Sequence, residues 1–124
     1  MENPSPADVA TRWIDKWAVP GIPSGGTDGF DLDHDLPYHN PRICLDTIVQ
    51  VLVRISSNPA DRHFQVLAAG PLEDLLVYHG PEFLEEIDTL CRRSPPFRAL
   101  LNGVWTSRID QGVADRLAKY RGAQ

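Results

Sequence analysis

A chain of 124 residues, 42% of them hydrophobic, has the size of one folded domain and can bury a core without disulfides or a metal. Its formal net charge of −5 argues against nucleic acid, whose phosphates it would repel, and fits a basic protein partner better. With neither a signal-peptide pattern nor an apolar run of about 18 residues, we expect a cytoplasmic protein that does not enter a membrane.

The first predicted helix lies within residues 1–18 and begins at the capping residue Ser5. Apolar side chains recur along it at helical spacing, at Val9, Trp13, Ile14 and Trp17. Large aromatic residues with this spacing are more often part of a core than of a ligand site. We therefore expect this stripe to face the interior.

Residues 19–40 are predicted to form a long acidic loop, because prolines and glycines interrupt any regular helix there. The loop contains alternating carboxylates, at Asp31, Asp33 and Asp35. Such carboxylates can bind calcium, but Leu36 and Arg42 stand where an EF-hand loop needs glycine and glutamate. We therefore expect no metal, and predict a solvated acidic surface that meets a basic partner.

The next predicted helix runs from Pro41 to about Ser57, and apolar residues cover most of its circumference. Only a narrow polar stripe remains, so we expect other helices to surround it at the centre of the fold. Cys44 in this helix and Cys91 later in the chain both lie in apolar helical patterns. They are predicted to be reduced core thiols.

The stretch from Leu67 to Gly80 reads L-A-A-G-P-L-E-D-L-L-V-Y-H-G. It follows a short helix that Asn58 is expected to cap. We predict a break at Gly70, a new helix that begins at Pro71, and a stop at His79. Two acids, Glu73 and Asp74, lie in the first turn of that helix, where the helix dipole favours negative charge.

Three further helices complete the prediction. One begins at Pro81, one follows the cap Ser94, and the last is expected to be capped by Ser107, with Asp110 three residues on. The helix after Ser94 has one predicted buried face, formed by Phe97, Leu100, Leu101, Val104 and Trp105. The fold class is therefore all-α, a compact bundle of about six or seven short helices that can stack as antiparallel hairpins. Residues 1–124 form a single domain, with a first helix in 1–18, a loop in 19–40 and a helical core in 41–121.

Two motifs carry a resemblance to a known family. They are A-A-G-P-L-E-D-L-L with a following H-G, and P-F-R-A-L-L-N-G-V-W about 25 residues later. From Pro41 to the C-terminus the chain resembles a bacterial family of small helical domains of unknown function. The resemblance implies a helical fold and a bacterial cytoplasmic origin, and no activity. The matching positions are Gly70, Pro71, Leu72, Glu73, Asp74, Leu75, His79, Phe97, Arg98, Leu101, Gly103 and Trp105.

The sequence contains no motif that assembles a reactive group, so we expect no enzyme and no cofactor. We expect a small protein-binding domain, with an immunity protein that neutralises a basic toxin as its most specific form. The candidate partner-binding residues are Asp31, Asp33, Asp35, Glu73, Asp74, His79 and Arg98. Two alternatives stay open: a structural scaffold that is a monomer or a homodimer, and a hydrolytic enzyme that uses Glu73, Asp74 and His79 with a partner residue such as Arg98.

Overall fold

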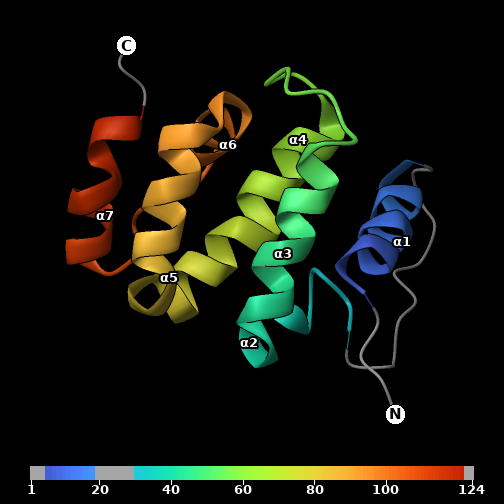
Figure 1. Cartoon of the computed structure of the whole chain (residues 1–124), viewed down its shortest axis with the longest axis horizontal. Coiled ribbons are helices and arrows are strands. Elements are labelled where there is room, and N and C mark those ends of the chain that lie inside the picture. Colours follow the sequence, from blue (N-terminus) through green and yellow to red (C-terminus); the bar gives the residue numbers. More distant parts are fainter. Residues whose placement is uncertain (1–4, 19–29, 122–124) are drawn as a thin grey trace.

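The computed structural model describes residues 5–18 and 30–121, and every regular element in these two ranges is helical. The elements are α1 (Pro6–Ala18), α2 (Leu36–His39), α3 (Pro41–Leu52), α4 (Arg62–Leu67), the π-helical turn η1 (Ala68–Leu72), α5 (Glu73–Arg93), α6 (Pro95–Leu101), α7 (Gln111–Leu117) and the 3-10 turn η2 (Ala118–Tyr120). The prediction of a compact all-α fold is confirmed (Figure 1). No helix in the described ranges has the length and apolar character needed to cross a bilayer.

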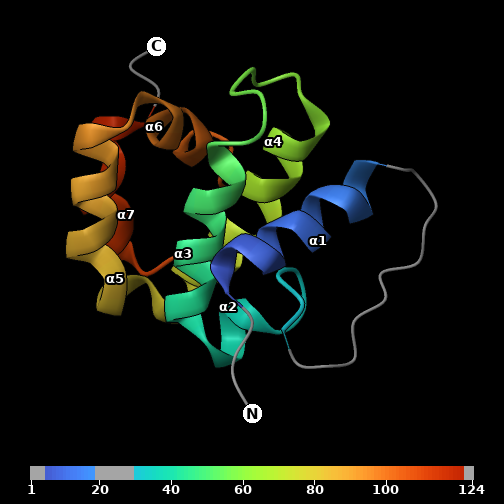
Figure 2. The ribbon, with the colours of Figure 1, turned by 45° about the vertical axis from the view of Figure 1, so that its right-hand side comes forward.

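Helix α3 lies at the centre of the molecule, between α1 on one side and α5 to α7 on the other (Figures 1 and 2). Its buried side chains are Cys44, Leu45, Thr47, Ile48, Val51 and Leu52. The prediction of a surrounded central helix is confirmed, but the helix ends at Leu52 and not near Ser57. Side chains after its end, at Ser56 and Asn58, accept local backbone N–H groups and so favour a turn over further helix.

The prediction of a loop that continues to residue 40 is wrong for residues 36–39, which form α2. Leu32 and Leu36 are fully buried, so this segment is drawn into the core rather than left on the surface. Asn40 then ends α2 and accepts the Ile43 N–H at the start of α3. The part of the predicted loop in residues 19–29 lies outside the described residues.

The predicted break at Gly70-Pro71 does not occur, because the chain passes from α4 to α5 through the π-helical turn η1. Proline lacks an N–H, and its ring would collide with the carbonyl four residues earlier in an ordinary α-helix. The wider turn accommodates Pro71, and the Glu73 N–H donates to the Ala68 carbonyl. The helix bends instead at His79, whose φ of −138° and ψ of 18° are non-helical.

The two sequence motifs meet in space. Gly103 lies against the buried Ala68, close enough that a Cβ at residue 103 would stand 2.8 Å from the Ala68 Cβ. Two residues later, the Trp105 N–H donates to Glu73 Oε1 over 3.0 Å. The prediction that Trp105 is buried is wrong, since 73% of it is exposed. Helix α6 ends at Leu101, so Trp105 no longer follows the helical face that buries Phe97.

Helix α7 packs on α5 at Gly80, where Val113 would touch any added side chain at 3.3 Å. The prediction that Ser107 caps this helix is wrong, because Asp110 is the capping residue and accepts the Val113 N–H. A second link joins the end of the described chain to α5, because the Tyr120 hydroxyl donates to Asp88 Oδ1 over 2.5 Å. This hydrogen bond, together with the nearby cations of Lys119, Arg92 and Arg116, lowers the pKa of Asp88.

We predict that Gly103→Ala destabilises the fold by about 1–3 kcal/mol, because the new methyl group overpacks against Ala68. The double variant Gly103→Ala with Ala68→Gly removes the clash. Its loss of unfolding free energy should therefore be smaller than the sum of the losses in the two single variants. Gly70→Ala is the matched control, because a Cβ at residue 70 would lie 3.8 Å from its nearest neighbour, Asp33 Oδ1. Urea unfolding of the wild type, of the three single variants (Gly103→Ala, Ala68→Gly and Gly70→Ala) and of the double variant measures these effects, and equal losses for Gly103→Ala and Gly70→Ala would contradict the packing argument.

We also predict that Tyr120→Phe makes the protein more sensitive to acid. A lowered pKa in the folded state means that ionised Asp88 stabilises the fold above its unfolded pKa of about 3.9, and that this contribution is lost as the pH falls through the folded value. Without the tyrosine hydroxyl the folded pKa rises, so acid unfolding should begin at a higher pH. Circular dichroism during acid titration measures this, and identical midpoints would contradict it.

Candidate functional site

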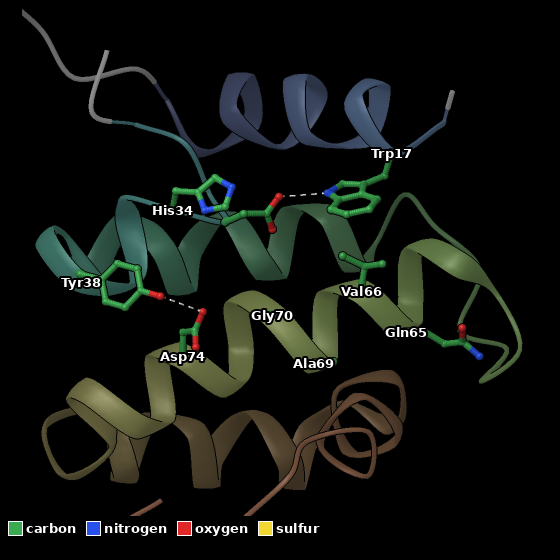
Figure 3. A pocket seen from close by; sticks show the side chains of 9 residues that line it. Trp17, His34, Tyr38, Gln65, Val66, Ala69, Gly70 and Asp74 are labelled. Atoms are coloured by element: carbon green, nitrogen blue, oxygen red, sulfur yellow. Dashed lines mark hydrogen bonds between the residues drawn. The ribbon is translucent and has the colours of Figure 1, made fainter. Parts of the chain in front are cut away.

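An open groove of about 600 Å³ runs between two parts of the fold. One wall comes from α1 and from the segment that leads into α2, and the other comes from α4, η1 and the start of α5 (Figure 3). The lining residues are Trp17, Asp33, His34, Tyr38, Gln65, Val66, Ala69, Gly70 and Asp74. Concave sites of this size commonly hold ligands, so the groove is the candidate functional site.

The π-helical turn shapes one wall of the groove. Val66, Ala69 and Gly70 present small or apolar groups there, and Asp74 follows at the start of α5 (Figure 3). Gly70 lies opposite Asp33, with room for one methyl group between the two residues. The groove is therefore narrow between Gly70 and Asp33, and each of its two walls carries a carboxylate.

Asp33 is the acid on the α1 side, and three donors surround it. Its Oδ1 accepts from Trp13 Nε1 at 2.9 Å, and its Oδ2 accepts from Trp17 Nε1 at 3.0 Å. Lys16 Nζ lies 2.7 Å from the same Oδ2. These bonds join the segment before α2 to one face of α1, which explains why both tryptophans of that helix point this way.

The prediction of a solvated acidic surface is wrong for Asp31 and Asp33, whose side chains are only 12% and 11% exposed. Asp31 accepts the His34 N–H and also pairs with Lys16. Asp35 is half-buried and accepts the Asp31 N–H. The carboxylates thus hold their own turn together, because short acidic side chains readily bond nearby backbone N–H groups.

Asp74 is the acid on the α5 side, and it has spare capacity to accept hydrogen bonds. Its Oδ2 accepts from the Tyr38 hydroxyl at 3.1 Å, and Arg108 approaches its Oδ1 only to 3.4 Å. A carboxylate offers about four acceptor sites. Burial raises the pKa of Asp74 despite these two partners. An ionisable group held at such a cost inside a groove is a candidate for binding a ligand.

Glu73, next to Asp74, points to a different neighbour. It accepts the Trp105 N–H through Oε1 and pairs with Arg108 through Oε2 at 3.3 Å. Arg108 therefore bridges both acids from the segment between α6 and α7. The two acids are anchors between elements that lie far apart in the sequence.

His79 lies at the bend of α5 and does not join the two acids. Its Nδ1 is 2.9 Å from Glu82 Oε1, and its Nε2 is 3.1 Å from the Tyr38 carbonyl. Both partners can only accept, so the ring satisfies both when it is protonated. The bond to Glu82 is the main cause of a raised pKa for His79.

Arg98 lies elsewhere and donates to the Cys91 carbonyl at 2.7 Å, where it ties α6 to the end of α5. The grouping of Glu73, Asp74, His79 and Arg98 is therefore not assembled at one place in the described structure. Cys44 and Cys91 are free and buried, as predicted. Burial raises the pKa of both thiols, that of Cys91 to about 11, which leaves them poor nucleophiles. The described residues hold no group of three or more potential metal ligands.

A model of one protein family matches residues 37–124, from α2 to the end of the chain. The chain belongs to the family of unknown function DUF6869. No curated protein and no solved structure is significantly similar to the chain. The family match includes both sequence motifs and agrees with the extent that the resemblance indicated.

The DUF6869 match divides the groove into two parts. Tyr38, Gly70 and Asp74 lie inside the matched residues, whereas Trp17 and Asp33 precede them. Helix α1, which forms part of one wall of the groove, therefore lies outside the residues that the family model matches.

Sequence reasoning missed Trp17, Tyr38 and Arg108 as site residues. Tyr38 fell in a predicted loop, and Arg108 lies outside both motifs. A lysine and two tryptophans on one face of α1 gave the only available signal, since these three donors suit a buried carboxylate. These three residues do not indicate which aspartate of the chain they bind.

We predict that stability depends on pH through His79. A raised folded pKa means that the contribution of His79 is fully present below its unfolded pKa of about 6.5, and is lost as the pH rises through the folded value. His79→Gln should flatten the stability profile in that window, and Glu82→Gln should move the transition to lower pH. Urea unfolding at several pH values measures both, and a profile unchanged in His79→Gln would contradict the assignment.

Proposed function

We propose that this member of the DUF6869 family is a protein-binding module whose groove takes a basic segment of another protein. The observation that supports this most is Asp74, a partly desolvated carboxylate with a raised pKa and spare acceptor sites, which lines an open groove. A lysine or arginine side chain placed there would supply the missing donors. It would also offset the cost of burying the charge.

The charge around the groove supports a cationic ligand. Five carboxylates lie on or beside it, at Asp31, Asp33, Asp35, Glu73 and Asp74. Three cations stand near them, at Lys16, Arg62 and Arg108. The local balance of acids over bases has the same sign as the net charge of the whole chain. The excess of acids at the groove and the net charge of the whole chain both attract a basic partner and repel an acidic one.

An immunity role is the most specific form of this proposal. In that role the partner is a basic toxin, and occupation of the groove blocks the toxin's cationic surface. The hydrolytic alternative has less support, because His79 is bonded to Glu82 and the Tyr38 carbonyl and no hydrogen bond or ion pair joins it to Asp74.

We predict that Asp74→Asn weakens binding of a fluorescent, arginine-rich peptide of about ten residues by about tenfold, the size expected for a charge-assisted hydrogen bond. Asparagine keeps an acceptor for Tyr38 and loses the charge. Gly70→Gln should weaken binding as well, because it places a long side chain in the groove. Fluorescence anisotropy at two salt concentrations measures the affinities.

Asp46→Asn is the matched control, because it makes the same change of charge on α3, outside the groove. It should leave the affinity close to that of the wild type. Equal losses in Asp46→Asn and Asp74→Asn would reduce the effect to net charge and overturn the proposed site. Tight binding of a glutamate-rich peptide of the same length would overturn the proposed ligand.

A further inference from the structure

An unbroken chain of contacts leads out of the groove along the surface of α5. Tyr78 packs edge-on against Tyr38 with ring centroids 4.8 Å apart, and Tyr38 donates to Asp74. Arg108 then contacts both Asp74 and Glu73, and Glu73 accepts the Trp105 N–H. We call these six residues the aromatic strip: Tyr78, Tyr38, Asp74, Arg108, Glu73 and Trp105. It is continuous with the groove, because Tyr38 and Asp74 belong to both.

Two large aromatic side chains of the strip are left uncovered. Trp105 is 73% exposed and Tyr78 is 53% exposed. The backbone of Trp105 is held by its N–H bond to Glu73, and the ring of Tyr78 packs against that of Tyr38. Tryptophan, tyrosine and arginine are the residues that most often dominate the binding energy of protein interfaces. A ring that is already packed, as that of Tyr78 is, loses little conformational freedom on binding.

Trp105 is also the residue at which the helical pattern fails. The pattern that buries Phe97 and Leu101 extends to Trp105 in the sequence, yet the fold leaves this indole in solvent. The core does not use it, so its apolar surface is available to a partner. Positions where a consistent local pattern is broken in this way are often functional.

We propose that the aromatic strip is the anchoring surface for the same basic protein segment that occupies the groove. The proposal rests on the proposed function and deepens it: one arginine or lysine seats against Asp74, and the residues on either side of it in the segment lie over Tyr78 and over Trp105. Cationic side chains are attracted to the faces of aromatic rings, and more strongly to tryptophan than to tyrosine.

The charges of the strip select this occupant over others. Two carboxylates outnumber the single guanidinium of Arg108, and Glu82, which pairs with His79 next to Tyr78 in the chain, is 63% exposed. An anionic membrane surface or a nucleic acid would also find exposed aromatic rings attractive, but these acids and the net charge of −5 would repel both. A second copy of the chain would bring the same acids against each other.

The test uses the full chain, the labelled arginine-rich peptide of about ten residues, and a shorter arginine-rich peptide of about four residues that fits within the groove. Trp105→Ala and Tyr78→Ala should each weaken binding of the long peptide by about tenfold or more, as expected of an interface hot spot. Both should change binding of the short peptide much less. Because both side chains are exposed, the variants should fold, and thermal unfolding checks this.

Val53→Ala is the matched control, since Val53 is 75% exposed at the end of α3 and belongs neither to the groove nor to the strip. It should leave both affinities unchanged. Unchanged affinity of the long peptide in Trp105→Ala and Tyr78→Ala would overturn the strip, while loss of binding in Asp74→Asn would still support the groove. If neither peptide binds the wild type, the proposed function fails and the strip fails with it.

Three further results would each overturn the strip as a site for a basic segment. The first is binding to vesicles of anionic lipid that is stronger than binding to the long arginine-rich peptide. The second is binding to a single-stranded oligonucleotide that is stronger than binding to that peptide. The third is a mass by sedimentation that doubles with concentration in the wild type but not in Trp105→Ala. Each of these would assign the exposed aromatic groups to a different occupant.

Discussion

Pro71 inside a continuous helix is the constraint on which the rest of the structure depends. Because proline cannot take part in an ordinary α-helical turn, the chain widens into a π-helical turn at residues 68–72. The extra residue in this turn sets the rotation of everything that follows it. Ala68 meets Gly103, Gly70 faces Asp33 across the groove, and Glu73 reaches the Trp105 backbone.

The turn also explains how one short stretch can organise distant elements. Asp74 accepts from Tyr38 of α2, and Arg108, in the segment between α6 and α7, contacts both Glu73 and Asp74. The His79 ring adds a second contact to Tyr38 at the bend of the same helix. Carboxylates that stand at a helix start in the sequence thus become anchors between elements. One of them, Asp74, keeps spare acceptor sites and a raised pKa at the edge of a groove.

The groove and the aromatic strip differ in how the fold uses them. The groove is built by contacts that close around Asp33, and its α1 wall precedes the residues that the DUF6869 model matches. The six residues of the strip all lie within the match.

Local patterns in the sequence predict the all-α class, several helix caps and most of the core, but not α2 or the π-helical turn. Asn40 and Ser94 cap helices where capping chemistry places them, and the apolar periods of α1 and α3 face the interior. These features depend on residues within a few positions of one another, so local patterns predict them. The seven candidate partner-binding residues also followed from local charge, and their role stays a prediction.

Which side chains meet depends on how distant helices pack, and the sequence patterns do not show it. The tertiary structure turned the predicted break at Pro71 into a π-helical turn, placed Asp31 and Asp33 beneath α1, and left Trp105 in solvent. It also gave Arg98 and His79 other partners than the acids, the Cys91 carbonyl and Glu82. The physical reason is that a buried carboxylate needs hydrogen-bond donors, and the packing of distant helices determines which donors reach it. The apolar periodicity of one helix shows which of its faces is buried, but not which helix covers that face.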